Sequence, residues 1–159
     1  MKSAAMALAV ITLLLGGCQG GVRPLNGLNQ QLNKLGNGAS PALAGDWLAL
    51  ITTRPGGRAQ VQLIDVQRGL PVPVIGLNRA DSLPISVAVD QQGERLALVR
   101  QRGDRSELLV YRRSLQASQP ISIEPAGVPR RVSLSANGRV LAVEVSRGGL
   151  WQVDLLELP

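Results

Sequence analysis

The chain has 159 residues and a formal charge of +6, so it fits one ordinary domain, and its basic surface favours an anionic partner. Its core must be aliphatic, because hydrophobic residues make up 45% of the chain although there is no Phe, one Tyr and two Trp. With no His and one Cys, the sequence excludes His-based catalytic sites, His/Cys metal centres and internal disulfides.

Residues 1–17 have the layout of a secretory signal peptide. Lys2 supplies the positive start, residues 4–15 are uncharged and mostly apolar, and Leu15-Gly16-Gly17-Cys18 closes the segment. A helix over the apolar run reaches only about 18 Å, well short of a hydrocarbon core of roughly 30 Å. The segment is therefore predicted to direct export and not to span a membrane.

The residues Leu15-Gly16-Gly17-Cys18 resemble the lipobox of bacterial lipoproteins. The resemblance implies cleavage between Gly17 and Cys18, lipid on the Cys18 thiol, and a membrane anchor in the cell envelope. Gln19 stands where an inner-membrane retention signal commonly has Asp, so the same resemblance favours the periplasmic side of the outer membrane. The alternative is an ordinary signal peptide cut near Gly20, with Cys18 in the discarded part.

Residues 18–39 comprise the lipidated Cys and a linker rich in Gly, Asn and Gln. Four leucines in this linker fall at helical spacings of three and four: Leu25, Leu28, Leu32 and Leu35. We expect a loop or frayed helix that packs against the folded domain. A helix lying on the membrane fits less well, because its polar face would be mostly neutral.

Residues 40–159 contain three copies of one pattern with a period of about 45 residues. Each copy has a Leu-Ala strand, a basic turn with glycine, and a second strand; the Leu-Ala strands start at Leu48, Leu96 and Leu141. Alternating apolar residues at 85–89 and 132–135 indicate a further strand before the second and third copies. The copies are predicted to be antiparallel meanders over 40–78, 79–125 and 126–159.

The Leu-Ala strands are apolar on both faces, as in residues 96–99, which predicts that neighbouring meanders sandwich them. Meanders stacked at this period are typical of β-propeller blades, each of which needs its neighbours to bury both faces. The predicted fold class is all-β, with about three blades forming a partial propeller. A three-unit β-sandwich is the alternative.

Residues 135–149 resemble the TolB-type, WD40-like propeller repeat, which reads roughly S-x-D-G-K-x-I-A-F-x-S-x-R-x-G. The likeness extends over residues 40–159 and is strongest to short three-repeat TolB-like proteins of cyanobacteria. Leu50, Leu98 and Val143 stand where the family usually has aromatic residues. Full-length family members combine six blades with an α/β domain in the Tol-Pal envelope system, whereas this chain has three repeats and no such domain.

Three blades leave two sheet faces without a neighbouring blade, although propellers close with about four to eight blades. Two arrangements would cover them. A second copy of the chain could complete a six-bladed ring as a homodimer. Alternatively, the leucine-bearing linker could fold over one face.

The acidic residues are spread along the chain and suggest no catalytic site. Asp65, Asp90 and Glu157 fall at turns and strand ends, where we expect structural roles. Asp104 and Glu107 flank a basic turn and should form local ion pairs. We expect neither catalysis nor a metal site nor a cofactor, and export argues against a nucleic-acid partner.

Three arginines recur at one position of the repeat, in the turn after each Leu-Ala strand: Arg54, Arg102 and Arg147. Stacked blades would place them on one rim, where they could contact lipid headgroups, lipopolysaccharide or an acidic protein. The alternative is a solvated face that deters edge-to-edge strand pairing.

Together these features predict a membrane-anchored, non-enzymatic module for protein interaction or scaffolding in the cell envelope. The alternative is a periplasmic binding module whose channel holds a small anionic ligand, such as a sugar acid or cell-wall fragment. A ligand binder should have a deep pocket lined by converging polar groups, whereas a scaffold should have a broad apolar or basic patch.

Overall fold

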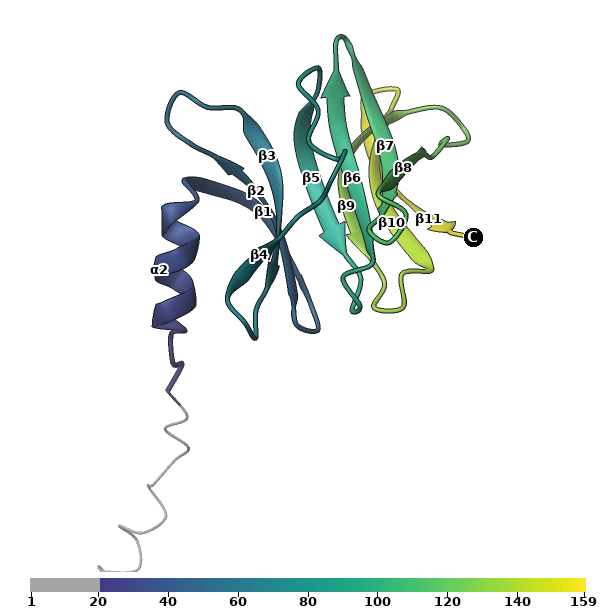
Figure 1. Cartoon of the computed structure of the whole chain (residues 1–159). Helices are drawn as coiled ribbons and strands as arrows, with labels where there is room; N and C mark the ends of the chain where they lie inside the picture. Colours follow the sequence, from purple (N-terminus) through teal and green to yellow (C-terminus); the bar gives the residue numbers. More distant parts are fainter. Residues whose placement is uncertain (1–20) are drawn as a thin grey trace, which may run out of the picture.

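A computed structural model describes residues 21–159 (Figure 1). The predicted signal peptide and Cys18 lie outside the described residues. Within 21–159 the chain forms one helix and eleven strands, which make three separate antiparallel sheets. Each sheet is a meander of consecutive strands, so the predicted all-β class and the three-meander organisation are confirmed.

The three sheets are named blades 1 to 3 in chain order. Blade 1 is formed by β1 (Asn37–Ala44), β2 (Trp47–Thr53), β3 (Ala59–Asp65) and β4 (Leu70–Val72). Blade 2 is formed by β5 (Leu83–Val89), β6 (Arg95–Arg102), β7 (Arg105–Arg112) and β8 (Ala117–Pro120). Blade 3 has three strands, β9 (Val128–Leu134), β10 (Val140–Arg147) and β11 (Leu150–Glu157).

The blades stack face to face in chain order (Figure 1). β5 contacts β1, β2 and β3 of the preceding blade, and β9 contacts β5, β6 and β7 in the same way. One aliphatic core therefore lies between blades 1 and 2, around Leu63, Leu98 and Tyr111, and a second lies between blades 2 and 3, around Val99 and Val143.

The Leu-Ala strand of blade 2 is buried on both faces, as predicted. Leu96 and Leu98 of β6 belong to the first core, whereas Ala97 and Val99 belong to the second. β10 differs, because Leu141, Val143 and Val145 are buried against blade 2 while its opposite face has no blade to cover it. The sandwich between two neighbouring meanders that was predicted for all three Leu-Ala strands is therefore wrong for blade 3, and also for blade 1, which has a neighbouring blade on one face alone.

The helix α2 (Asn26–Lys34) lies against the outer face of blade 1 (Figure 1). Leu28, Leu32 and Leu35 line one apolar hollow together with Ile64 and Pro71 of blade 1. Ile64 is only 3% exposed as a result. The leucine-bearing segment thus packs on the domain as expected, but as a regular helix instead of a loop, and β1 begins at Asn37, inside the predicted linker.

A repeated contact joins each blade to the next at the turn end of the sheets. The Trp47 ring of blade 1 lies over Gly93 of blade 2, where an added Cβ would come within 2.3 Å of the indole. Arg95 occupies the same repeat position in blade 2, and its Nη1 donates to the Gly138 carbonyl of blade 3 at 2.9 Å. Each turn glycine therefore accommodates a side chain of the preceding blade.

Candidate contact surface at the arginine rim

The β2–β3, β6–β7 and β10–β11 hairpins project from the same end of the three blades, at the top of Figure 1. Arg54, Arg102 and Arg147 begin these three hairpins, so the stacking places them on one rim. We call this hairpin end the arginine rim. Their environments differ, however, because the surrounding loops are not repeated.

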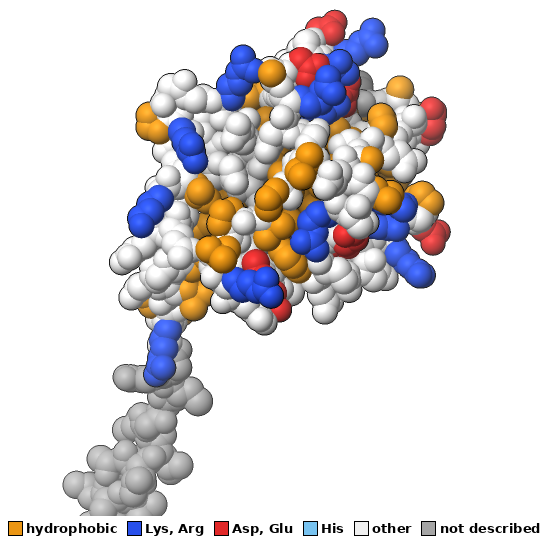
Figure 2. Space-filling view, in the orientation of Figure 1, with side chains coloured by type: hydrophobic (Ala, Val, Ile, Leu, Met, Phe, Trp, Pro, Cys, Tyr) orange, Lys and Arg blue, Asp and Glu red, His pale blue; other side chains and the backbone are white. Residues whose placement is uncertain are grey.

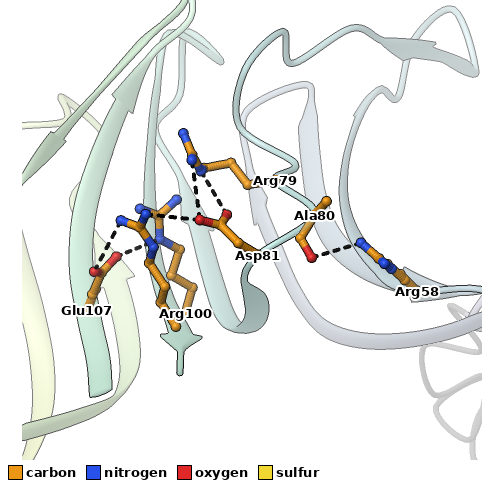
Figure 3. Close-up of polar contacts among 7 residues, drawn as sticks. Arg58, Arg79, Ala80, Asp81, Arg100 and Glu107 are labelled. Carbon is orange, nitrogen blue, oxygen red and sulfur yellow. Dashed lines mark hydrogen bonds and ion pairs between the residues drawn. The ribbon is translucent and has the colours of Figure 1, made fainter. Parts of the chain in front are cut away.

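Asp81 is the centre of an ion-pair cluster on this rim (Figure 3). It lies in the loop between β4 and β5, and Arg79 Nε donates to its Oδ1 at 2.9 Å. Arg102 Nη2 of the β6–β7 hairpin lies 3.0 Å from its Oδ2. The loop is thereby fastened to blade 2 by a carboxylate shared between two guanidinium groups.

A second carboxylate on the rim, Glu107, pairs with the largely buried Arg100. Arg100 is 8% exposed, and its Nε donates to Glu107 Oε2 at 2.9 Å across the β6–β7 hairpin (Figure 3). Arg58 of blade 1 donates to the Ala80 carbonyl at 2.8 Å. Because three arginines share two carboxylates and Arg58 binds only a carbonyl, the cluster keeps an excess of positive charge.

Arg147 joins β10 to β11 and to the loop that precedes β9. Its guanidinium forms a two-pronged ion pair with Asp154 of β11, and its Nε donates to the Pro125 carbonyl at 2.9 Å. The hydrogen bonds from Arg147 lower the pKa of Asp154, which partial desolvation opposes. Arg54, in contrast, is exposed at the tip of the β2–β3 hairpin. The three arginines thus share a repeat position, but they differ in their contacts.

The same cluster yields a prediction for the ionisation of Asp81. The hydrogen bonds from Arg79, together with the charge of Arg102, hold the pKa of Asp81 at about 2, below the ordinary 3.8. Because the pKa is lowered in the folded state, the pair stabilises the fold above about pH 4 and loses this contribution as the pH falls through 2. Arg79→Gln should raise the pKa toward 3.8.

A carboxyl NMR titration measures this pKa directly. Arg105→Gln is the matched control, because Arg105 is a rim arginine whose 4.0 Å ion pair is with Asp104. If Arg105→Gln raises the pKa of Asp81 as much as Arg79→Gln does, the assigned hydrogen bonds are wrong.

The inner strands β1, β5 and β9 line an open groove of about 540 Å³. Two of its hydroxyls are engaged in joining the blades: the Val87 amide donates to Ser40 Oγ, and the Val132 amide donates to Ser86 Oγ, each at 3.2 Å. The charged side chain in its lining is Arg131, which pairs with Glu144 at 3.9 Å. The polar groups of the groove thus join neighbouring blades, and they do not converge on a ligand site as those of a binding pocket would.

Residues 21–159 contain no cluster of acidic, His or Cys side chains that could hold a metal. In the same range no helix is long and apolar enough to cross a membrane. Two of the three acids predicted to have structural roles hold turns: Asp90 Oδ1 accepts the Glu94 amide at 2.8 Å, and Asp65 Oδ1 accepts the Arg68 amide at 3.0 Å. Glu157 is exposed at the end of β11, and its structural role stays a prediction.

The sequence did not predict that Arg58, Arg79 and Asp81 belong to the cluster on the rim. The first lies in a hairpin, whereas the other two lie in the loop between blades 1 and 2, which differs in length and sequence from the loop between blades 2 and 3. The Arg100–Glu107 pair had a usable signal, because these residues are directly opposite in the predicted hairpin. Figure 2 shows basic and acidic groups intermixed over this end of the molecule.

No family model and no curated protein matches the sequence. Solved structures do match it in fold. TolB from Acinetobacter baumannii has a TM-score of 0.58 and 15% identity over 77% of this chain and 30% of its own. Hydrazine synthase from Kuenenia stuttgartiensis has a TM-score of 0.51 and 16% identity over 76% of this chain and 34% of its own.

These likenesses define the class of fold, a β-propeller of the TolB type, here represented by three blades that do not close into a ring. The chain spans about a third of the length of either solved protein. At this identity the likeness extends to the fold alone.

Proposed function

We propose that this chain is a lipid-anchored, non-enzymatic interaction module of the bacterial cell envelope. The observation that carries the proposal is the segment Leu15-Gly16-Gly17-Cys18 in front of a small propeller-type domain. Lipid on Cys18 would hold the protein at the periplasmic side of a membrane, with the outer membrane favoured by Gln19. Two or more acyl chains make such attachment nearly permanent.

The position of α2 supports an arrangement in which the anchor and the free surface are separated. The chain enters α2 on the outer face of blade 1, while blade 3 lies at the other end of the stack (Figure 1). An anchor attached ahead of α2 would therefore leave blade 3 accessible to a partner. Contact through the blade surfaces needs no catalytic residue.

The arginine rim supports contact with an anionic partner in the envelope. Arg54 is exposed, and the cluster around Asp81 has more guanidinium groups than carboxylates. Lipid headgroups, lipopolysaccharide or an acidic protein surface would match this charge. The internal ion pairs of Arg102 and Arg147 leave Arg54 as the one of the three repeat arginines best placed for such a contact.

Processing at Cys18 gives the direct test of the anchor. The wild-type mature chain should begin at Cys18 and carry the mass of a diacylglycerol, because a lipoprotein signal peptidase acts on the lipidated Cys. Cys18→Ala should accumulate as a precursor that retains residues 1–17. Intact-mass spectrometry of both purified proteins measures the difference.

The control variant is Gln19→Ala, which leaves Cys18 in place and should be lipidated and cut like the wild type. An ordinary signal peptide would give another pattern, in which Cys18→Ala is processed normally. That pattern, or an unmodified Cys18 in the mature wild-type protein, would refute the lipid anchor.

A further inference from the structure

β11 is the unpaired edge of blade 3. In blades 1 and 2 the corresponding strands β3 and β7 are covered by the fourth strands β4 and β8, but β11 pairs with β10 alone. The apolar side chains of β11 on the face turned away from blade 2 are exposed as well, with Val153 69% and Leu155 72% exposed. An edge strand of this length that bears exposed apolar side chains is a template for pairing with another strand.

The repeat identifies what these exposed side chains correspond to. The Ala of each Leu-Ala pair lies opposite Leu63 in blade 1, Val110 in blade 2 and Leu155 in blade 3. The first two are buried against the following blade, whereas Leu155 has none. β11 therefore presents side chains of the kind that the other blades bury.

The free backbone amide and carbonyl groups of β11 belong to the same residues as the exposed apolar side chains. The Leu158 amide donates to the Arg139 carbonyl, and the β10–β11 register continues from there without a shift. Because amide and carbonyl groups alternate sides along a strand, those of Trp151, Val153 and Leu155 face the free edge. The exposed apolar side chains and the free backbone groups thus belong to the same residues.

We propose that a second copy of this chain pairs with β11 through its own β11, antiparallel and centred on Val153. In this register Val153 faces Val153 of the second copy, and Trp151 faces Leu155 of the second copy. Gln152 then faces Asp154 of the second copy, so no like charges oppose each other within the strands. A two-fold axis through Val153 makes the contact self-complementary and closed.

A further propeller blade packed on the outer face of blade 3 fits less well than a second β11 paired along the edge. The position of Ile51 and Val99, which face the next blade in blades 1 and 2, is Glu144 in blade 3. Glu144 pairs there with Arg130 at 3.5 Å and with Arg131 at 3.9 Å. These charges would be buried under another blade, whereas edge pairing leaves them in water.

The outer face of blade 1 is also unavailable as the partner surface. Two copies that complete a six-bladed ring must pack blade 3 of one copy on this face of the other. α2 already covers it and buries Ile64. Edge pairing leaves α2 in place, so it requires no rearrangement of the chain.

Oxidative cross-linking of the full chain in detergent tests this register. In Val153→Cys the two thiols meet across the axis at a Cα separation of about 5.5 Å, within disulfide range. In Leu155→Cys, an equally exposed control, the two thiols are offset by four residues, or about 13 Å. We expect about ten-fold more cross-linked dimer from Val153→Cys than from Leu155→Cys, and none from the wild type, whose single thiol, Cys18, carries lipid in the proposed mature protein.

Val153→Lys provides a second test, because it places two like charges opposite each other on the axis. Light scattering should give the mass of two chains for the wild type and of one chain for Val153→Lys. Equal cross-linking of the two cysteine variants, a monomeric wild type, or a dimer that Val153→Lys leaves intact would each overturn the proposal. Cross-linking of the wild type itself would point to a free Cys18 thiol and so to failure of the lipid anchor, which keeps the two proposals distinguishable.

Discussion

Gly93→Ala is expected to lower the free energy of unfolding by about 2–4 kcal/mol, a large effect for the addition of one methyl group. A Cβ at Gly93 would lie 2.3 Å from the Trp47 ring, and the backbone φ of +64° disfavours any side chain there. Trp47 has little freedom to move away, because the guanidinium of Arg113 lies 4.7 Å from its ring centroid. Urea denaturation followed by circular dichroism measures the loss.

Gly103→Ala is the matched control for this prediction. Gly103 has nearly the same backbone angle, φ +60°, but an added Cβ would meet nothing within 4 Å. Only the cost of the left-handed backbone remains, about 1 kcal/mol. Equal losses for the two variants would mean that the Trp47–Gly93 contact does not hold blades 1 and 2 together.

Leu96→Ala and Leu141→Ala should each cost about 2–5 kcal/mol of unfolding free energy. Both leucines are 0% exposed and occupy the same repeat position. Leu96 lies in the core between blades 1 and 2, and Leu141 lies in the core between blades 2 and 3. Truncation leaves a cavity that the aliphatic neighbours cannot fill. The same denaturation measurement compares them.

Leu48→Ala supplies the comparison within the repeat. Leu48 has the equivalent position in blade 1 but is half-buried, on the side that faces α2 instead of another blade. Its truncation should cost about 1 kcal/mol, since less apolar surface returns to water. A loss at Leu48 as large as that at Leu96 would show that α2 shields blade 1 as fully as a blade does.

Much of the fold was predictable because the repeat fixes it locally. Alternating residues at 85–89 and the Leu-Ala strands gave β5, β6 and β10, and turn glycines such as Gly93 and Gly138 marked the hairpin ends. The strands β1, β4 and β8 were not predicted. Pro41, Pro71 and Pro120 lie in them, and two of the three are short edge strands whose pairing depends on a neighbour more than on their own pattern.

The arginine rim was predictable only in part. The period of the repeat placed Arg54, Arg102 and Arg147 at one end of the blades, since hairpins at equivalent positions must emerge together. Their partners could not be inferred, because Asp81 and Pro125 lie in loops between blades that differ in length and sequence. Ion pairing depends on side-chain positions that no periodicity encodes.

The placement of α2 has a consequence for how many copies can associate. Repeated blades joined by identical head-to-tail contacts have no built-in limit, so a chain open at both ends would grow into filaments. α2 covers the outer face of blade 1, and its own outward side is polar, with exposed residues such as Gln30 and Asn33. The helix thus blocks head-to-tail growth from that end, and blade 3 is the end that remains open for the proposed pairing.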